Sequence, residues 1–107
     1  MDVEQLFGQM VAAGAKAFGD NWGPVEKFAK VEFKTIAQRI EQIGQGLAKD
    51  DFDLATGKML LAMQVNLATS AIAGATTLTM LAVEAAINAV LAVIKAAVNS
   101  ALKVALL

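Results

Sequence analysis

The chain has 107 residues, of which 57% are hydrophobic and 18% are charged, and its formal net charge at pH 7 is −1. That length suffices for one domain with a modest core and is too short for two. A charge this close to zero gives no general attraction to nucleic acid, so no such partner is expected. The absence of cysteine and histidine excludes disulfides, thiolate metal sites and the usual proton shuttle near neutral pH.

The composition predicts an all-α fold. Much of the hydrophobic fraction is alanine, which is the best helix former, and the chain contains a single proline. The first predicted helix spans residues 2–18, with Asp2 as its N-cap, Gln5 in a capping-box position and Gly19 as a natural stop. Its apolar side chains recur at helical spacing: Val3, Leu6, Phe7, Met10, Val11, Ala17 and Phe18.

A turn at residues 19–24 precedes the second predicted helix, in which Pro24 takes the first position. At this turn Trp22 is expected to pack as a plug, and an exposed contact with a partner or a membrane surface is the alternative. The second helix is amphipathic and ends near Gly44–Gly46 or shortly afterwards, so residues 1–48 are predicted to form an amphipathic helical hairpin. Its apolar face comprises Val25, Ala29, Phe33, Ile36, Ala37, Ile40, Ile43 and Leu47.

Residues 49–53 are predicted to form a polar connector, in which Asp51 or Asp53 caps the helix that follows. Residues 54–107 are predicted to form one long, Ala-rich apolar helix, nearly 80 Å in length at about 1.5 Å per residue. Gly74 is the one doubtful place, where the helix could kink or split. Because the polar side chains keep their register through Gly74, a continuous helix is favoured.

The C-terminal half repeats with a period of eleven residues. Four blocks align without gaps, over residues 62–72, 73–83, 84–94 and 95–105. Eleven residues in three turns give about 3.67 per turn, which keeps one face aligned along a nearly straight helix. Polar side chains return to one side of this helix, and we call them the polar stripe. They are Asn66, Ser70, Thr77, Glu84, Asn88, Lys95, Asn99 and Lys103.

The apolar arc beside the polar stripe is wider than on an ordinary surface helix. Three arrangements could cover it: several copies bundled together, insertion into a bilayer, or a monomeric bundle in which the first two helices wrap around the third. The monomeric bundle is less favoured, because the first two helices are much shorter than the third. We therefore expect one helical domain that self-assembles as a homo-oligomer, tube or filament in a structural role. Small residues suit close helix contact: Ala71, Gly74 and Ala75.

Membrane insertion is the second hypothesis. Residues 59–83 carry no formal charge over 25 positions, which is enough to span about 30 Å of hydrocarbon. Against insertion, that segment holds several Gln, Asn, Ser and Thr side chains, and Glu84 lies near the middle of the other apolar window, residues 76–94. The alternatives are thus a membrane-inserted or pore-forming protein and, third, a coat protein of an apolar surface. The N-terminus has no basic segment before an apolar core, so no secretory signal is expected, and the location is cytoplasmic or membrane-associated.

No constellation of residues points to catalysis, a cofactor or a metal. The serines and threonines have no histidine to activate them, so neither enzymatic activity nor a small-molecule substrate is expected. Gly44 and Gly46 suit a helix end better than a phosphate loop, and the acidic residues at 50–53 suit helix caps better than a cation loop. Glu84 and Lys95, eleven residues apart, are placed to pair between staggered copies, or else are two solvated charges.

Overall fold

Four α-helices and one short 3-10 turn make up the fold, in a computed structural model that describes all 107 residues. The helices are α1 (Val3–Phe18), α2 (Trp22–Ala48), α3 (Leu54–Ala75) and α4 (Met80–Leu102), and the turn η1 (Gly19–Asn21) joins the first two. The chain contains no strand, so the predicted all-α class is confirmed.

Acidic side chains cap two of the helices. The Asp2 carboxylate accepts hydrogen bonds from the backbone N–H groups of Glu4 and Gln5, at 2.9 and 3.2 Å. At the start of α3, the Asp53 carboxylate accepts from the Thr56 backbone N–H at 2.8 Å. These N–H groups have no partner within their own helix, so each cap satisfies donors that would otherwise need water. The caps predicted at Asp2 and at Asp53 are confirmed.

The C-terminal half forms two helices, so the favoured expectation of one continuous helix over residues 54–107 is wrong. α3 ends at Ala75, and α4 begins only at Met80. Between them the backbone is extended at Thr76 (φ −129°, ψ −179°) and at Thr79 (φ −75°, ψ 157°). The alternative of a split near Gly74 is therefore the correct one.

Threonine side chains lie at both ends of the break. The Thr76 hydroxyl donates to the Ile72 carbonyl oxygen at 2.9 Å, and the Thr79 hydroxyl accepts from the Ala82 N–H at 3.1 Å. The Thr79 hydroxyl thus caps the start of α4. The Thr76 bond is of a kind that Thr35 and Thr69 also make inside α2 and α3. The break lies just beyond Gly74, which stays inside α3.

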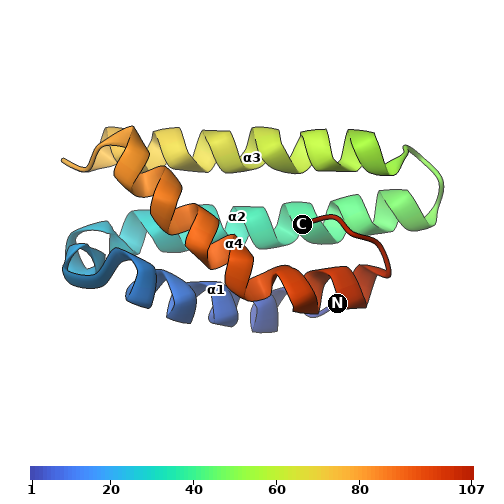
Figure 1. The fold of residues 1–107 in the computed structure, drawn as a ribbon, viewed down its shortest axis with the longest axis horizontal. Coiled ribbons are helices and arrows are strands. Elements are labelled where there is room, and N and C mark those ends of the chain that lie inside the picture. The colour runs from blue at the N-terminus through green and yellow to red at the C-terminus, as the bar shows by residue number, and fades with distance from the viewer.

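α1, α2 and α3 run side by side as an antiparallel row, and α4 crosses one face of that row (Figure 1). α3 packs along α2 and α4 packs along α1, whereas the contact between α3 and α4 is smaller. The Cα radius of gyration is 13.4 Å, close to the ~13 Å typical of a folded chain of 100 residues. Because the C-terminal half folds back on itself, each of its helices gains a partner from the first half. The first two helices are therefore long enough to pack against both helices of the C-terminal half, although large apolar side chains of α3 and α4 remain exposed.

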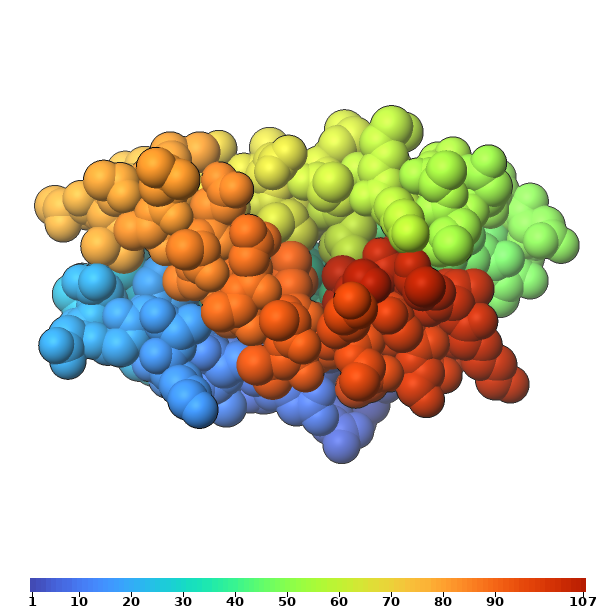
Figure 2. Space-filling view, viewed as in Figure 1, coloured from blue at the N-terminus to red at the C-terminus, as the bar shows by residue number.

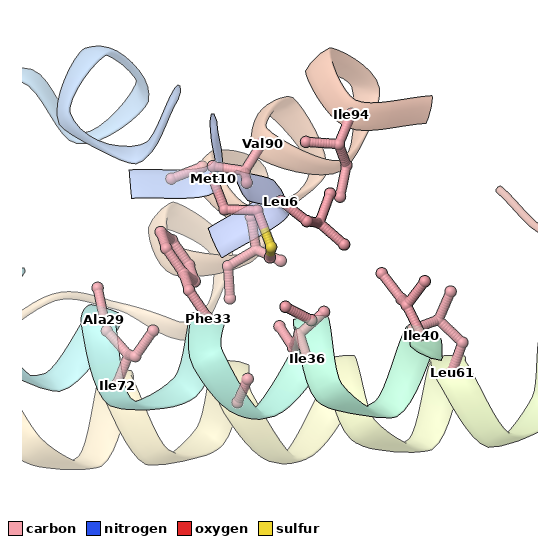
Figure 3. Close-up of a cluster of buried hydrophobic side chains, with 14 of the residues drawn as sticks. Leu6, Met10, Ala29, Phe33, Ile36, Ile40, Leu61, Ile72, Val90 and Ile94 are labelled. Carbon is pink, nitrogen blue, oxygen red and sulfur yellow. The ribbon is translucent and has the colours of Figure 1, made fainter. Parts of the chain in front are cut away.

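The core is centred on α2. Phe33, Ile36 and Ile40 have no exposed surface and lie in its middle. Side chains from the other three helices converge on them (Figure 3): Leu6 and Met10 of α1, Leu61 and Ile72 of α3, and Val90 and Ile94 of α4. The apolar face predicted for the second helix is buried, with Leu47 half-buried at its end, and of the face predicted for the first helix only Ala17 is exposed. The glycines expected to end the second helix lie inside it, where Gly44 faces Leu102 and Gly46 faces Phe52.

Gly14 lets α1 approach α2 closely, and Gly8 on the same helix provides a matched control. A Cβ atom at residue 14 would lie 2.6 Å from Phe33 Cε2, whereas one at residue 8 would have no neighbour within 4 Å. We expect Gly14→Ala to destabilise the protein by about 1–3 kcal/mol through overpacking. Gly8→Ala should stabilise it by about 0.5–1 kcal/mol through helix propensity. Urea unfolding followed by circular dichroism measures both, and shifts of the same sign would contradict this packing.

Asp53 makes stability depend on pH. The hydrogen bond from the Thr56 backbone N–H, followed by one from the Thr56 side chain, lowers the pKa of Asp53 below its usual 3.8. Because the folded-state pKa is depressed, this charge stabilises the fold above the unfolded pKa, and the effect is lost as the pH falls through the folded value. Asp53→Asn keeps a capping oxygen without the charge, so it should be less stable than the wild type near neutral pH and equally stable in strong acid. A difference in unfolding free energy that stays constant with pH would refute the assignment.

Candidate interaction surfaces

The polar stripe is divided between two helices that run in different directions. Two of its members lie on α3, one in the following connection, and the rest on α4 or directly after it. In that order they are Asn66 and Ser70, then Thr77, then Glu84, Asn88, Lys95, Asn99 and Lys103. All are exposed except Asn99, which is half-buried. The eleven-residue pattern therefore does not run along one straight helix.

Two members of the polar stripe meet across a groove between α3 and α4. Asn66 and Asn88 line this hollow of about 300 Å³ from opposite sides. Figure 2 shows it on the face that α4 crosses, between the yellow-green α3 and the orange-red α4. The rest of the lining is mainly apolar: Lys58, Leu61, Ala62, Val65, Leu91 and Leu107. The volume is at the lower limit for small-molecule sites.

Asn99 holds the last residues of the chain against the bundle. Its amide nitrogen donates to the Leu107 main-chain oxygen at 3.2 Å, and its amide oxygen accepts from the Leu107 N–H at 2.9 Å. Lys103 ends α4 in a left-handed conformation (φ 60°), which turns the chain back so that Leu106 is buried. Asn99 is thus paired within its own chain.

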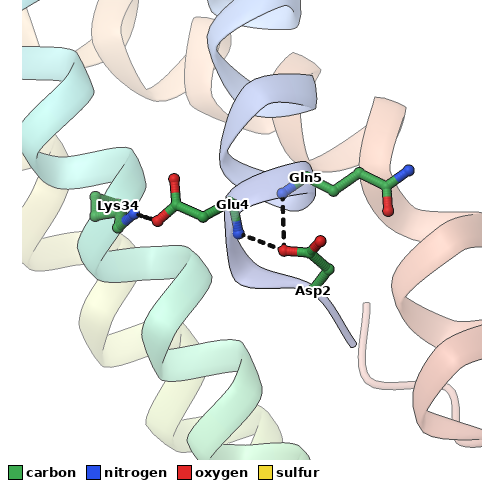
Figure 4. A network of polar contacts seen from close by, with 4 residues as sticks. All are labelled: Asp2, Glu4, Gln5 and Lys34. Atoms are coloured by element: carbon green, nitrogen blue, oxygen red, sulfur yellow. Dashed lines mark hydrogen bonds and ion pairs between the residues drawn. The ribbon is translucent and has the colours of Figure 1, made fainter.

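The charged side chains that pair lie in the first half of the chain. Lys30 and Glu26 form an ion pair at 3.2 Å, one helical turn apart. Lys34 of α2 binds the Glu4 carboxylate of α1, next to the Asp2 cap (Figure 4). On α4, Glu84 and Lys95 are both exposed, and neither has an ion-pair partner within the chain. Their pairing between copies stays a prediction.

Trp22 packs at the corner where α1 turns into α2. Its ring stacks on Phe33 at a centroid distance of 6.5 Å and is tilted against Phe18 at 6.0 Å. Aromatic pairs in this range contribute about 0.5–1.5 kcal/mol beyond the area they bury. The indole is half-buried, so it fills the corner next to Gly14 and keeps one edge accessible.

α3 carries a second apolar face on the side away from the core. We call it the α3 strip, and its residues return to one side of the helix at spacings of three and four: Leu60, Met63, Leu67, Ala71 and Gly74. Leu60 lies at the edge of the strip, where part of its side chain packs against the core. Met63 is 56% exposed and Leu67 is 63% exposed, and Met59 borders them at 56%. No charged side chain lies on α3 beyond Lys58. Two small residues predicted for close helix contact, Ala71 and Gly74, thus lie on this strip, and Ala75 is the exposed last residue of α3.

The large exposed side chains on the strip and at its border are functional candidates that the sequence pattern could have identified. Met59, Met63 and Leu67 are four residues apart, opposite a buried face that includes Leu61 and Ile72. The positions of charged residues alone do not distinguish a helix with one wide apolar face from a helix with two separate apolar faces. The spacing of large side chains distinguishes them.

α4 also exposes apolar side chains. Met80, Leu81 and Val93 are more than half exposed, and alanines separate them. By length and composition α4 is the one helix able to cross a membrane, and 33% of its most apolar stretch is buried within the fold. The buried core helix of a soluble protein can have the same length and composition. One such helix is therefore weak evidence for membrane insertion.

A substitution at Asn99 tests whether its hydrogen bonds hold the last residues of the chain against the bundle, and the same substitution at Asn88 is the control. Asn99→Ala removes two hydrogen bonds to Leu107, each with a net contribution of about 0.5–1.5 kcal/mol. We expect a loss of about 1–3 kcal/mol in unfolding free energy and faster amide hydrogen exchange at residues 104–107. Asn88→Ala, at an exposed residue, should change stability by less than about 0.5 kcal/mol. Equal exchange rates in the two variants would argue against the Asn99 contact.

Comparison of the chain with models of protein families, with curated proteins and with solved structures gives no match. No relative therefore assigns a role to the groove, to α4 or to the α3 strip. What distinguishes the three is the chemistry of their own side chains.

Proposed function

We propose that this protein is a non-enzymatic, self-assembling helical protein, and that a second copy covers the α3 strip. The observation that carries the proposal is the pair of apolar faces on α3, one in the core and one exposed. A helix in a monomeric soluble domain ordinarily has one apolar face and a charged opposite face. On the α3 strip no charge interrupts the apolar surface.

The free energy available from the strip indicates a weak, reversible association. Burying a fully exposed Leu or Met side chain recovers about 1.5–3 kcal/mol. Met59, Met63 and Leu67 are each a little over half exposed, so six such side chains in a dimer supply roughly 5–10 kcal/mol. Association costs about 4–15 kcal/mol in lost translational and rotational freedom. These two ranges overlap, so this surface supports at most a weak dimer, which forms only as the concentration rises.

Leu67 and Val93 provide a matched test, because they are 63% and 65% exposed on different helices. Leu67→Gln should raise the dimer dissociation constant at least roughly tenfold, which corresponds to about 1.4 kcal/mol. Val93→Gln should leave it unchanged. Sedimentation equilibrium without detergent measures both. A wild-type protein that remains monomeric at every accessible concentration, or equal effects of the two changes, would defeat the proposal.

Membrane insertion through α4 is the second candidate, favoured by the length and apolar composition of that helix. Lys95 weighs against it, because it lies near the middle of α4, and a charged side chain at the centre of a membrane helix costs roughly 2.5–3.5 kcal/mol on insertion scales. Glu84 lies in the second turn of α4, where the cost is smaller. Flotation with neutral phospholipid vesicles distinguishes the two functions. Binding of the wild type to vesicles that persists in Leu67→Gln would favour insertion over self-assembly.

A further inference from the structure

We propose that the two copies pack α3 against α3 in an antiparallel manner, around a two-fold axis that passes next to Leu67. This inference rests on the proposed self-assembly and specifies its geometry. In a two-fold interface the same patch is used on both copies, so residue i meets residue j, and j meets i. Residues at equal distances from Leu67 then face one another across the axis.

Side-chain size along the α3 strip favours the antiparallel arrangement. Leu60 and Met63 are large and precede Leu67, whereas Ala71 and Gly74 are small and follow it. Leu60 and Gly74 are each seven residues from Leu67, and Met63 and Ala71 are each four residues from it. An antiparallel pair therefore sets each large side chain against a small residue of the other copy. A parallel pair would set large against large and leave a void between the small residues, and voids in packed interfaces are destabilising.

Gly74 supplies independent support. It lies in the last turn of α3, and glycine is a poorer helix former than alanine. No packing contact within the chain requires this glycine, because a Cβ atom there would meet no other atom within 4 Å. A helix of a second copy approaching at this point would require it. In the antiparallel pair that approach is made by Leu60 of the other copy.

A hollow next to the α3 strip extends the interface onto α2. It measures about 160 Å³ and is lined by Phe28, Val31, Glu32 and Ala71. Val31 is 64% exposed, although it lies on an otherwise polar side of α2. In the antiparallel pair Met63 of the other copy lies against Ala71, at the edge of this hollow, and its flexible thioether chain suits an irregular gap.

The added contact matters because the strip alone is small. From residue 60 to residue 74 it spans about 21 Å and is one helix, about 10 Å, wide. A specific interface buries at least about 1,000 Å² in total. Phe28 and Val31 enlarge the contact on each copy, and they adjoin only the C-terminal half of the strip.

Cysteine cross-linking tests the arrangement, because the chain has no cysteine of its own. Met63→Cys and Ala71→Cys both replace side chains that have exposed surface. With a short thiol-specific cross-linker, a mixture of the two variants should give covalent dimers, and either variant alone should give few. In the antiparallel pair two copies of residue 63 are about 12 Å apart along the axis, which is eight residues at 1.5 Å each.

The outcomes separate this inference from the function on which it rests. Efficient cross-linking of Met63→Cys with itself would indicate a parallel pair, which would overturn the geometry and retain self-assembly. No cross-linking in any mixture, with a monomeric wild type in sedimentation, would overturn both.

A pair of glycine variants provides a second readout. Gly74→Gln should raise the dimer dissociation constant at least tenfold, whereas Gly8→Gln, at a helical glycine equally free of neighbours, should leave it unchanged. Neither change should lower the stability of the monomer, since glutamine is the better helix former. An unchanged dissociation constant for Gly74→Gln would contradict the close approach at this residue.

Discussion

The break at Thr76–Thr79 is the constraint on which the rest of this architecture depends. At this break the chain leaves α3 and returns across the bundle, and the Thr79 hydroxyl caps the start of α4. α3 then covers one side of α2, and α4 packs along α1. An unbroken helix would have left most of its apolar surface without a partner in the chain. Because of this turn, many apolar side chains of the C-terminal half are buried against α1 and α2 in the core of a single domain.

Closing the core does not use all of the apolar surface in the C-terminal half. After Leu54 the chain has only four charged side chains, Lys58, Glu84, Lys95 and Lys103. The outer sides of α3 and α4 are consequently as poor in charge as their inner sides. α4 distributes its exposed apolar groups among alanines and two charges, whereas the α3 strip concentrates large side chains in one line. This difference makes α3 the stronger candidate for contact with a second copy, and α4 the weaker candidate for contact with lipid.

Local signals in the sequence predicted the local structure well. The apolar spacing of residues 25–47 identified the buried face of α2, and Asp2 and Asp53 were recognisable as caps. The polar register continues through Gly74 and so favours a continuous helix, whereas the backbone turns extended at Thr76 and Thr79, just beyond that residue. The helical spacing of the polar residues indicates which side of a helix each would occupy, but it does not indicate whether the helix is continuous.

The candidate surfaces could be predicted only in part. The polar stripe was predicted on one straight helix, whereas the meeting of Asn66 and Asn88 across a groove depends on the crossing of α3 and α4. The contact of Asn99 with Leu107 likewise requires the chain to turn back after α4. By contrast, the spacing of Met59, Met63 and Leu67 was present in the sequence from the start. The burial of Leu61 and Ile72 on the opposite face of α3 shows that this spacing marks a second apolar face.

Methionine oxidation tests most directly whether the α3 strip is covered by a second copy. Met63 and Met80 are 56% and 51% exposed in the single chain, so a mild oxidant should modify both at similar rates in dilute solution. As the protein concentration rises, the account predicts that Met63 becomes protected while Met80 does not. Equal oxidation of the two residues at all concentrations would contradict it.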